Sequence, residues 1–246
     1  MGMPDTEPHL SVVFPAYNEQ ERIGESLRKA RTWLEEHQPE HEVLVVDDGS
    51  SDATAAVVLA EAASWPRLRL VQLGENRGKG AATRHGVLGA TGTWILCSDA
   101  DLSTPIHDVE RLLAAAAASR APVVIGSRSI TGSNITQRQP LYRVAMGRAF
   151  NSATRLVTPG GHNDTQCGFK LYRRDVAQDL FSRLTVDGFA FDVEVLYLAH
   201  ALGHQVAEVA VTWHNDERSS VNVLLDPARM FVDIFRIRRR HRGLTR

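Results

Sequence analysis

Short apolar runs alternate with longer amphipathic segments along the first half of the chain. The runs are too short for ordinary helices and predict β-strands, and the helical periodicity between them predicts α-helices. The predicted strands cover residues 10–14, 42–46, 68–73, 93–97 and 122–126, and the predicted helices cover residues 19–37, 52–63, 78–89 and 106–119. Asn18 is the expected N-cap of the first helix. This alternation predicts an α/β fold with a mainly parallel central sheet and helices on both faces.

The pattern changes after residue 129. The predicted elements there are a polar loop over 129–139, a helix over 140–157, a turn over 160–164, a strand over 167–172, a helix over 190–202, a strand over 205–213, a polar loop over 214–225 and a helix over 227–240. No stretch has the composition of a linker. We therefore predict a single domain over residues 1–225, followed by a C-terminal amphipathic helix and basic tail over 226–246.

Polar residues gather where the predicted strands end. Asn18 and Glu19, Asp47 and Asp48, Asn76 and Arg77, and Asp99 and Asp101 each follow one of the first four strands. The carboxyl ends of parallel strands meet at one edge of a sheet, where α/β proteins place their ligands. The coincidence across four strands predicts a functional site at that edge.

Asp99 and Asp101 follow the apolar run of residues 94–97. In extended backbone, residues two apart point the same way, so their carboxylates repel each other unless a cation or hydrogen bonds lie between them. Oxygen ligands suit Mg²⁺ or Mn²⁺. A solvated acidic loop is the alternative, and the neighbouring strand ends favour the metal. Asp47 either serves the same site or caps the turn that follows it.

Composition narrows the class of protein. The chain has 246 residues, a net charge of −1 and 43% hydrophobic residues, which fits one large globular domain and gives no overall case for nucleic-acid binding. Its two cysteines lack metal-ligand spacing and are expected to be reduced, buried thiols of a cytosolic protein. We expect no signal peptide and no transmembrane helix. The GENRGKGA segment lacks the spacing and the Ser or Thr of a phosphate-binding P-loop.

Six motifs, in order, resemble those of family 2 glycosyltransferases of the GT-A fold. The resemblance spans about residues 9–225. Within the family, the motifs are most similar to those of the polyprenyl-phosphate sugar synthases, which include the dolichyl-phosphate glucosyltransferases. The motifs are VVFPAYNE (12–19), VLVVDDGSSDAT (43–54), NRGKGAATRHG (76–86), CSDADLSTP (97–105), VIGSR (124–128) and DTQCGFKLY (164–172).

The resemblance implies a metal-dependent, inverting transfer of a hexose from a nucleotide-diphosphate sugar. The expected donor is UDP-glucose, the expected acceptor is a polyprenyl phosphate, and the expected cofactor is Mg²⁺ or Mn²⁺. It also implies a nucleotide-sugar half over about 9–128 and an acceptor half over about 129–225. A hydroxyl acceptor and a mannose synthase using GDP-mannose remain alternatives. A nucleotidyltransferase is disfavoured because PAYNE is not a Gly-rich basic loop, and the intact Asp99/Asp101 pair argues against a silent binding module.

On the donor side, the resemblance carries over residue by residue. Asp48 matches the carboxylate that meets the base or ribose, and Lys79 matches a phosphate-facing cation. Asp101 is the expected metal ligand, with Asp99 nearer the sugar. Ser103 stands where relatives often have Gln, so no third protein ligand is expected from it. The matched residues at the first strand end are Pro15, Tyr17, Asn18 and Glu19.

On the acceptor side, a phosphomonoester is largely dianionic at neutral pH and needs cations rather than a general base. Arg128 and Arg143 are the candidate cations, because Arg recognises phosphate bidentately. The resemblance adds Gln166 and Lys170 to the acceptor side. Asp192 is a base toward a hydroxyl acceptor, or a sugar contact beside a phosphate. Helix geometry puts Glu194 and Asp192 on different sides of their helix, so only one of them is expected to face the site. Arg148 is a further candidate cation for the phosphate. In relatives a Lys commonly stands where this chain has Ser220, and Arg218 is expected to supply that cation instead.

The C-terminal segment combines an apolar stripe with an arginine cluster. The stripe consists of Met230, Phe231, Ile234, Phe235 and Ile237, and residues 236–246 carry six arginines and no acid. Such a helix suits the interface of an anionic membrane, and it equally suits packing on the domain. With a lipid acceptor, the expected location is peripheral, on the cytoplasmic face of a membrane.

Overall fold

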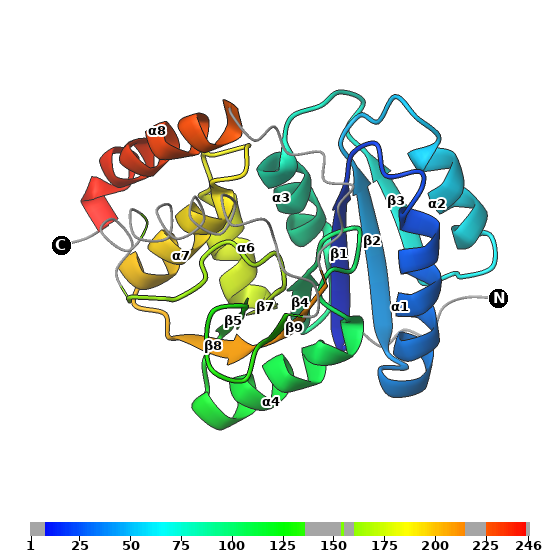
Figure 1. Cartoon of the computed structure of the whole chain (residues 1–246), viewed down its shortest axis with the longest axis horizontal. Helices are drawn as coiled ribbons and strands as arrows, with labels where there is room; N and C mark the ends of the chain where they lie inside the picture. The colour runs from blue at the N-terminus through cyan, green and yellow to red at the C-terminus, as the bar shows by residue number, and fades with distance from the viewer. Residues whose placement is uncertain (1–7, 136–153, 155–159, 215–224, 245–246) are drawn as a thin grey trace.

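A seven-stranded sheet forms the centre of the protein (Figure 1). The computed structural model describes residues 8–135, 154, 160–214 and 225–244. The strand order is β3-β2-β1-β4-β7-β5-β8, and β6 and β9 form a separate pair. The strands are β1 (Leu10–Ala16), β2 (His41–Asp47), β3 (Leu68–Gln72), β4 (Trp94–Cys97), β5 (Val123–Ser127), β6 (Asn134–Ile135), β7 (Lys170–Arg173), β8 (Val206–Ala210) and β9 (Thr212–Trp213).

Helices cover both faces of this sheet. They are α1 (Ile23–His37), α2 (Thr54–Ala62), α3 (Lys79–Gly89), η1 (Ile106–Asp108), α4 (Val109–Ser119), α6 (Arg174–Ser182), α7 (Phe191–Ala201), α8 (Leu225–Arg240) and η2 (Arg242–Leu244). Side chains of α1, α2 and α4 pack on one face, and those of α3, α6 and α7 pack on the other. Within β1, Val12 faces the first core and Val13 faces the second, which explains why the strand is apolar throughout. The predicted α/β architecture is confirmed.

The strand β7 runs antiparallel to both of its neighbours. Its first residue, Lys170, pairs with Cys97 at the end of β4 and with Ile125 in β5. All other pairs in the large sheet are parallel. Because β7 runs backwards, the segment that precedes it lies at the carboxyl ends of β4 and β5. Residues 160–169 are thereby brought to the edge that carries Asp99 and Asp101.

Several predicted boundaries were wrong. The first helix begins at Ile23 rather than residue 19, and Asn18 does not cap it, because its φ of 54° places it in a turn instead. The predicted helix over 106–119 divides into η1 and α4. The helix α6 was not predicted. Of the predicted helix over 140–157, all but Thr154 lies outside the described residues.

The helix α8 packs on the domain through one side. Met230, Ile234 and Ile237 are buried against α7 and the loop before it. Phe231 and Phe235, from the same predicted stripe, are exposed. The Glu194 carboxylate of α7 accepts a hydrogen bond from His241 Nε2 at 2.7 Å, which fixes the far end of the helix. Packing on the domain is therefore confirmed for three of the five stripe residues, and the other two face outward.

Two further expectations concern the whole chain. Within the described residues, none of the helices combines the length and the apolar character needed to cross a membrane. Cys97 and Cys167 are free and buried, as predicted. Burial raises the pKa of the Cys167 thiol to about 11, so the thiol stays protonated and unreactive at neutral pH.

Candidate active site

Asp99 and Asp101 lie in the turn that follows β4, at the predicted edge of the sheet. The Lys79 ammonium, in the first turn of α3, lies 2.6 Å from Asp99 Oδ1. The backbone N–H of Ser103 donates to Asp101 Oδ1 at 2.9 Å, which closes the turn. Leu102, between them, has a φ of 49°, a conformation that is rare for a leucine. Strained backbone of this kind is often found at functional sites.

The two carboxylates have opposite electrostatic environments. Burial alone would raise the pKa of Asp99, but the Lys79 ammonium beside it lowers the pKa below its usual value. Burial and the neighbouring Asp99 charge raise the pKa of Asp101. Asp101 is thus the carboxylate whose charge is least compensated by the protein, and a cation beside it would relieve that repulsion.

Arg22 is a site residue that the sequence reasoning missed. Its Nη1 lies 3.8 Å from Asp101 Oδ2, and its guanidinium forms two hydrogen bonds with Glu19, at 2.6 and 2.7 Å. Glu19 was expected on the nucleotide side, and the structure shows it as the partner of Arg22. The sequence feature that could have identified Arg22 is its spacing of three residues from Glu19, which allows a local ion pair.

The two aspartates at the end of β2 have different hydrogen-bond partners. Asp47 Oδ1 accepts a hydrogen bond from the Ser50 N–H at 3.0 Å, so of its two alternatives the structure shows the capped turn. Asp48 Oδ1 and Oδ2 accept from the N–H groups of Arg77 and Gly78 at 2.9 and 2.8 Å. Asp48 thereby ties the strand end to the loop that carries Lys79. Its expected contact with the base or ribose stays a prediction.

The loop after β1 is bound to the loop after β2. Asn18 Oδ1 accepts from the Ser51 N–H at 2.9 Å, and the Asn18 N–H donates to Ser50 Oγ at 2.9 Å. Pro15 lies inside β1 rather than after it, paired with Val46. Tyr17 is 39% exposed. These residues lie at the predicted edge, and their nucleotide contacts stay predictions.

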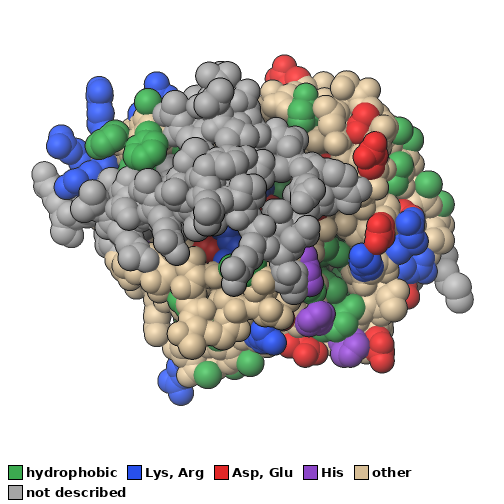
Figure 2. Space-filling view, in the orientation of Figure 1, with side chains coloured by type: hydrophobic (Ala, Val, Ile, Leu, Met, Phe, Trp, Pro, Cys, Tyr) green, Lys and Arg blue, Asp and Glu red, His purple; other side chains and the backbone are tan. Residues whose placement is uncertain are grey.

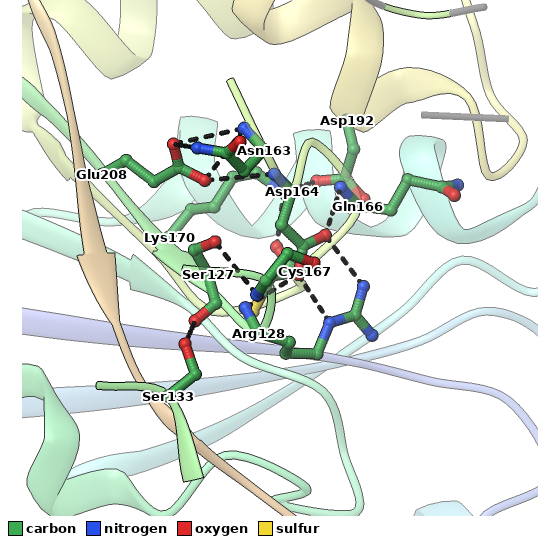
Figure 3. A network of polar contacts seen from close by, with 11 residues as sticks. Ser127, Arg128, Ser133, Asn163, Asp164, Gln166, Cys167, Lys170, Asp192 and Glu208 are labelled. Carbon is green, nitrogen blue, oxygen red and sulfur yellow. Dashed lines mark hydrogen bonds and ion pairs between the residues drawn. The ribbon is translucent and has the colours of Figure 1, made fainter. Parts of the chain in front are cut away.

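Arg128 follows β5 and is held by Asp164. The guanidinium donates to the Asp164 carboxylate through Nε at 2.7 Å and Nη2 at 2.9 Å (Figure 3). Burial alone would raise the pKa of Asp164, but the Arg128 charge lowers it to about 2. The sequence reasoning chose Arg128 and missed Asp164, although Asp164 opens the DTQCGFKLY motif.

Lys170 and Asp192 form a buried ion pair. The Lys170 ammonium lies 2.5 Å from Asp192 Oδ1 and donates to the Cys167 carbonyl oxygen. The Lys170 side chain is 1% exposed. Lys170 is therefore the counter-ion of Asp192 in this structure, and its direct contact with an acceptor stays a prediction. Glu194 points elsewhere, as expected, and binds the N–H groups of Thr185 and Val186.

The remaining acceptor-side residues are only partly described. Gln166 Nε2 lies 3.9 Å from the Met230 sulfur, which places the DTQCGFKLY motif beside α8. Arg143, Arg148, Arg218 and Ser220 lie outside the described residues. Gly168 has a close neighbour, because a Cβ on it would lie 2.5 Å from both Asp99 carboxylate oxygens.

The residues present fit a dication with few protein ligands. Within the described ranges, no group of three or more His, Cys, Asp and Glu side chains converges as a metal site. The suitable oxygen donors are the carboxylates of Asp101 and Asp99, whose mutual repulsion already raises the pKa of Asp101. Mg²⁺ typically binds one or two carboxylates together with substrate phosphates. Such a donor set suits a metal that arrives with a nucleotide diphosphate.

Curated relatives match nearly the whole chain. The sequence is similar to the dolichyl-phosphate β-glucosyltransferase of Dictyostelium discoideum, with 36% identity over 95% of this chain and 75% of the relative. It is also similar to the dolichyl-phosphate β-glucosyltransferase of Drosophila melanogaster, with 37% identity over 93% of this chain and 74% of the relative.

Solved structures share the fold. The mannosyltransferase of Pyrobaculum calidifontis in complex with GDP-Man and Mn²⁺ matches with a TM-score of 0.59 and 24% identity, covering 87% of this chain and 59% of that one. The glucosyl-3-phosphoglycerate synthase of Mycobacterium tuberculosis in complex with UDP matches with a TM-score of 0.66 and 20% identity, covering 96% of this chain and 80% of that one. The sequence model of glycosyl transferase family 2 matches residues 11–181. The chain is therefore a glycosyltransferase, and it belongs to glycosyl transferase family 2.

Proposed function

We propose that this enzyme transfers glucose from UDP-glucose to a polyprenyl phosphate of the dolichyl type and inverts the anomeric centre. The similarity to dolichyl-phosphate β-glucosyltransferases over more than nine-tenths of the chain carries this proposal. The arrangement of charges at the sheet edge supports it, because carboxylates with a lysine lie on one side of the edge and an arginine lies on the other.

On the donor side, we assign Lys79 to the charge of the nucleotide diphosphate and the two carboxylates to the metal ion that accompanies it. Departure of the nucleotide concentrates negative charge on its phosphates, and a cation placed there lowers the energy of the transition state. The Lys79 ammonium is held by Asp99 at 2.6 Å at the N-terminus of α3, where the helix dipole also favours an anion. We assign Lys79 to the donor phosphates.

Asp101 and Asp99 are the residues that would hold Mg²⁺ or Mn²⁺. When bound, the ion supplies Lewis-acid stabilisation of the leaving diphosphate. Arg22 lies on the other side of Asp101, at 3.8 Å, and Glu19 fixes the Arg22 guanidinium. These two residues place a fixed positive charge beside the Asp101 carboxylate.

On the acceptor side, the enzyme needs cations rather than a base. The second pKa of a phosphomonoester is about 6, so the acceptor carries its nucleophilic charge at neutral pH. Arg128, which follows β5, is a described arginine on the acceptor side, and its side chain is 28% exposed. Asp192, neutralised by Lys170, then contacts the sugar instead of removing a proton.

The outer side of α8 suits an anionic membrane. Phe231, Val232 and Phe235 are exposed there, with exposures of 39%, 49% and 69%. Figure 2 shows exposed hydrophobic side chains next to Lys and Arg over this part of the molecule. Aromatic side chains insert at the headgroup boundary while arginines bind anionic lipids. Because Met230 of α8 also touches Gln166, a membrane bound at α8 lies beside the proposed acceptor side. We place the enzyme on the cytoplasmic face.

The decisive experiment supplies radiolabelled UDP-glucose and a polyprenyl phosphate, with and without Mn²⁺. We expect labelled product in the butanol phase, dependent on the metal and abolished by Asp101→Ala. A product of the opposite anomeric configuration to the donor, by NMR, is expected. Label in the aqueous phase with a hydroxyl acceptor, or transfer only from GDP-mannose, would overturn the acceptor or the donor assignment respectively.

Membrane attachment has its own test. We expect the wild-type protein to sediment with vesicles containing anionic lipids, and Phe231→Ser/Phe235→Ser to remain in the supernatant. Leu59→Ser is the control, since Leu59 is exposed by 56% on α2. Equal sedimentation of all three proteins would contradict a role for α8.

A further inference from the structure

Two linked carboxylates, the partly buried Glu208 and the buried Asp164, lead from β8 to Arg128 (Figure 3). Glu208 lies in β8, opposite Ile125 of β5. Its carboxylate accepts hydrogen bonds from the N–H groups of Asn163 and Asp164, each at 3.1 Å. It also accepts from Asn163 Nδ2 at 3.1 Å. Glu208 therefore fixes the backbone of the segment that presents Asp164.

Asp164 in turn fixes Arg128 at three points. The Arg128 backbone N–H, Nε and Nη2 all donate to the Asp164 carboxylate, at 3.0, 2.7 and 2.9 Å. The Asp164 side chain is only 1% exposed, so this pairing takes place away from water. Such a bidentate geometry sets the plane of the guanidinium as well as its position.

The face of the same guanidinium is covered by Trp213. The Arg128 Cζ lies 5.6 Å from the centroid of the Trp213 ring, in β9. This distance is within the range of a cation–π contact. With Nε and Nη2 bound to Asp164 and one face against Trp213, Nη1 is the donor group left for a ligand: within the described part of the chain it donates to no protein atom.

We propose that Glu208 and Asp164 are positioning residues that orient Arg128 toward the phosphate of the acceptor. This inference rests on the proposed function for the identity of the acceptor. Asp164 is itself negative, so it does not attract the phosphate, and its contribution is to orient Arg128. A free arginine side chain loses conformational entropy when it binds a phosphate. A guanidinium that is already fixed loses less, so binding is tighter. The sequence shows no hint of Glu208, because its hydrogen bonds to Asn163 and Asp164 form only in the folded sheet, between residues more than forty apart in the chain.

The test uses Glu208→Gln, which keeps the size of the side chain and removes its charge. Glu42→Gln is the control, since Glu42 is likewise a strand carboxylate, more buried than Glu208, that accepts from a loop residue, Thr91, with 2.6 and 2.8 Å bonds. Asn163→Ala is a milder variant that removes the contact from Nδ2 and keeps the contact from the Asn163 backbone N–H. Acceptor and donor Michaelis constants are measured for each, with the melting temperature.

We expect the Michaelis constant for the polyprenyl phosphate to rise about tenfold in Glu208→Gln and by a smaller factor in Asn163→Ala. The constant for the nucleotide sugar should not change. In Glu42→Gln both constants should stay at the wild-type value, even with an equal loss of melting temperature. A rise in both constants, or in neither, for Glu208→Gln would overturn the inference and leave the proposed function standing.

Binding of phytanyl phosphate, measured by calorimetry, separates the two proposals without turnover. We expect about tenfold weaker binding to Glu208→Gln than to the wild type, and unchanged binding to Glu42→Gln. Absence of both phytanyl phosphate binding and lipid product in the wild type would overturn the proposed function and this inference together. Equal binding by all three proteins would overturn the inference alone.

Discussion

The Lys79 ammonium lies 2.6 Å from the Asp99 carboxylate, although the two residues are twenty apart in the sequence. Lys79 begins α3, and Asp99 follows the end of β4. The pair has two consequences. The Asp99 charge raises the pKa of Lys79 despite its burial, so the lysine is a permanent cation. The Lys79 charge keeps Asp99 ionised, so the pair presents a fixed dipole to the donor.

Lys79→Met should lower kcat/KM by about 100-fold, because it removes the cation that faces the leaving diphosphate. Steady-state kinetics with UDP-glucose test this. Lys79→Arg is the control and should retain more activity than Lys79→Met, since it preserves the charge. Equal kinetics for Lys79→Met and the wild type would exclude Lys79 from the donor phosphates.

Gly168→Ala should reduce activity with little change in stability. The added Cβ would lie 2.5 Å from the Asp99 oxygens, so the carboxylate must turn away from Lys79. We expect kcat/KM to fall about tenfold while the melting temperature stays close to wild type. Gly188→Ala, at a site with no atom within 4 Å of the new Cβ, should affect neither quantity. Full activity in Gly168→Ala would mean that Asp99 need not stay paired with Lys79.

Lys170→Met should destabilise the fold by about 3–5 kcal/mol, because it leaves Asp192 buried without its counter-ion. The double variant Lys170→Met/Asp192→Leu should recover most of this loss, since no unpaired charge remains. Urea denaturation measures the free energy of unfolding for both. The double variant should nevertheless stay inactive if Asp192 contacts the sugar. Additive losses in the double variant would contradict the ion pair as the cause.

Asp164 should contribute to acid stability. Its folded pKa of about 2 lies below the unfolded value of about 3.9, so its contribution is present above about pH 4 and is lost as the pH falls toward 2. The contribution is about 2.6 kcal/mol at neutral pH. In Asp164→Asn, the free energy of unfolding should therefore fall less steeply between about pH 5 and pH 2 than in the wild type.

Urea denaturation at a series of pH values measures this slope. Asp175→Asn is the control, because the Asp175 side chain is 64% exposed and paired only with the surface residue Arg173. It should reduce the acid slope by less than Asp164→Asn does, because Arg173 lowers the Asp175 pKa across a pair that is exposed to solvent. An unchanged slope in Asp164→Asn would show that the ion pair with Arg128 does not account for the acid loss.

The sequence alone predicted the sheet and the edge at which the site forms. Buried parallel strands must be apolar on both faces, so β1, β2 and β4 stand out as short apolar runs, and the polar residues after them mark their carboxyl ends. The positions of Asp99 and Asp101 followed from these local signals, and Lys79 was expected from the resemblance to the family. Helix starts were predicted less well, because Asn18 hydrogen-bonds to Ser51 across the sheet edge instead of capping α1.

Only the tertiary structure decided which charges pair. Lys170 is an isolated cation in the sequence and becomes the buried partner of Asp192 because β7 runs antiparallel into the site. Arg22 approaches Asp101, and Glu208 reaches the segment of Asp164, through contacts between residues far apart in the chain. The physical reason is that strand polarity and helix periodicity are local properties of a sequence. The partner of a buried charge is set by the packing of distant segments, which no local pattern encodes.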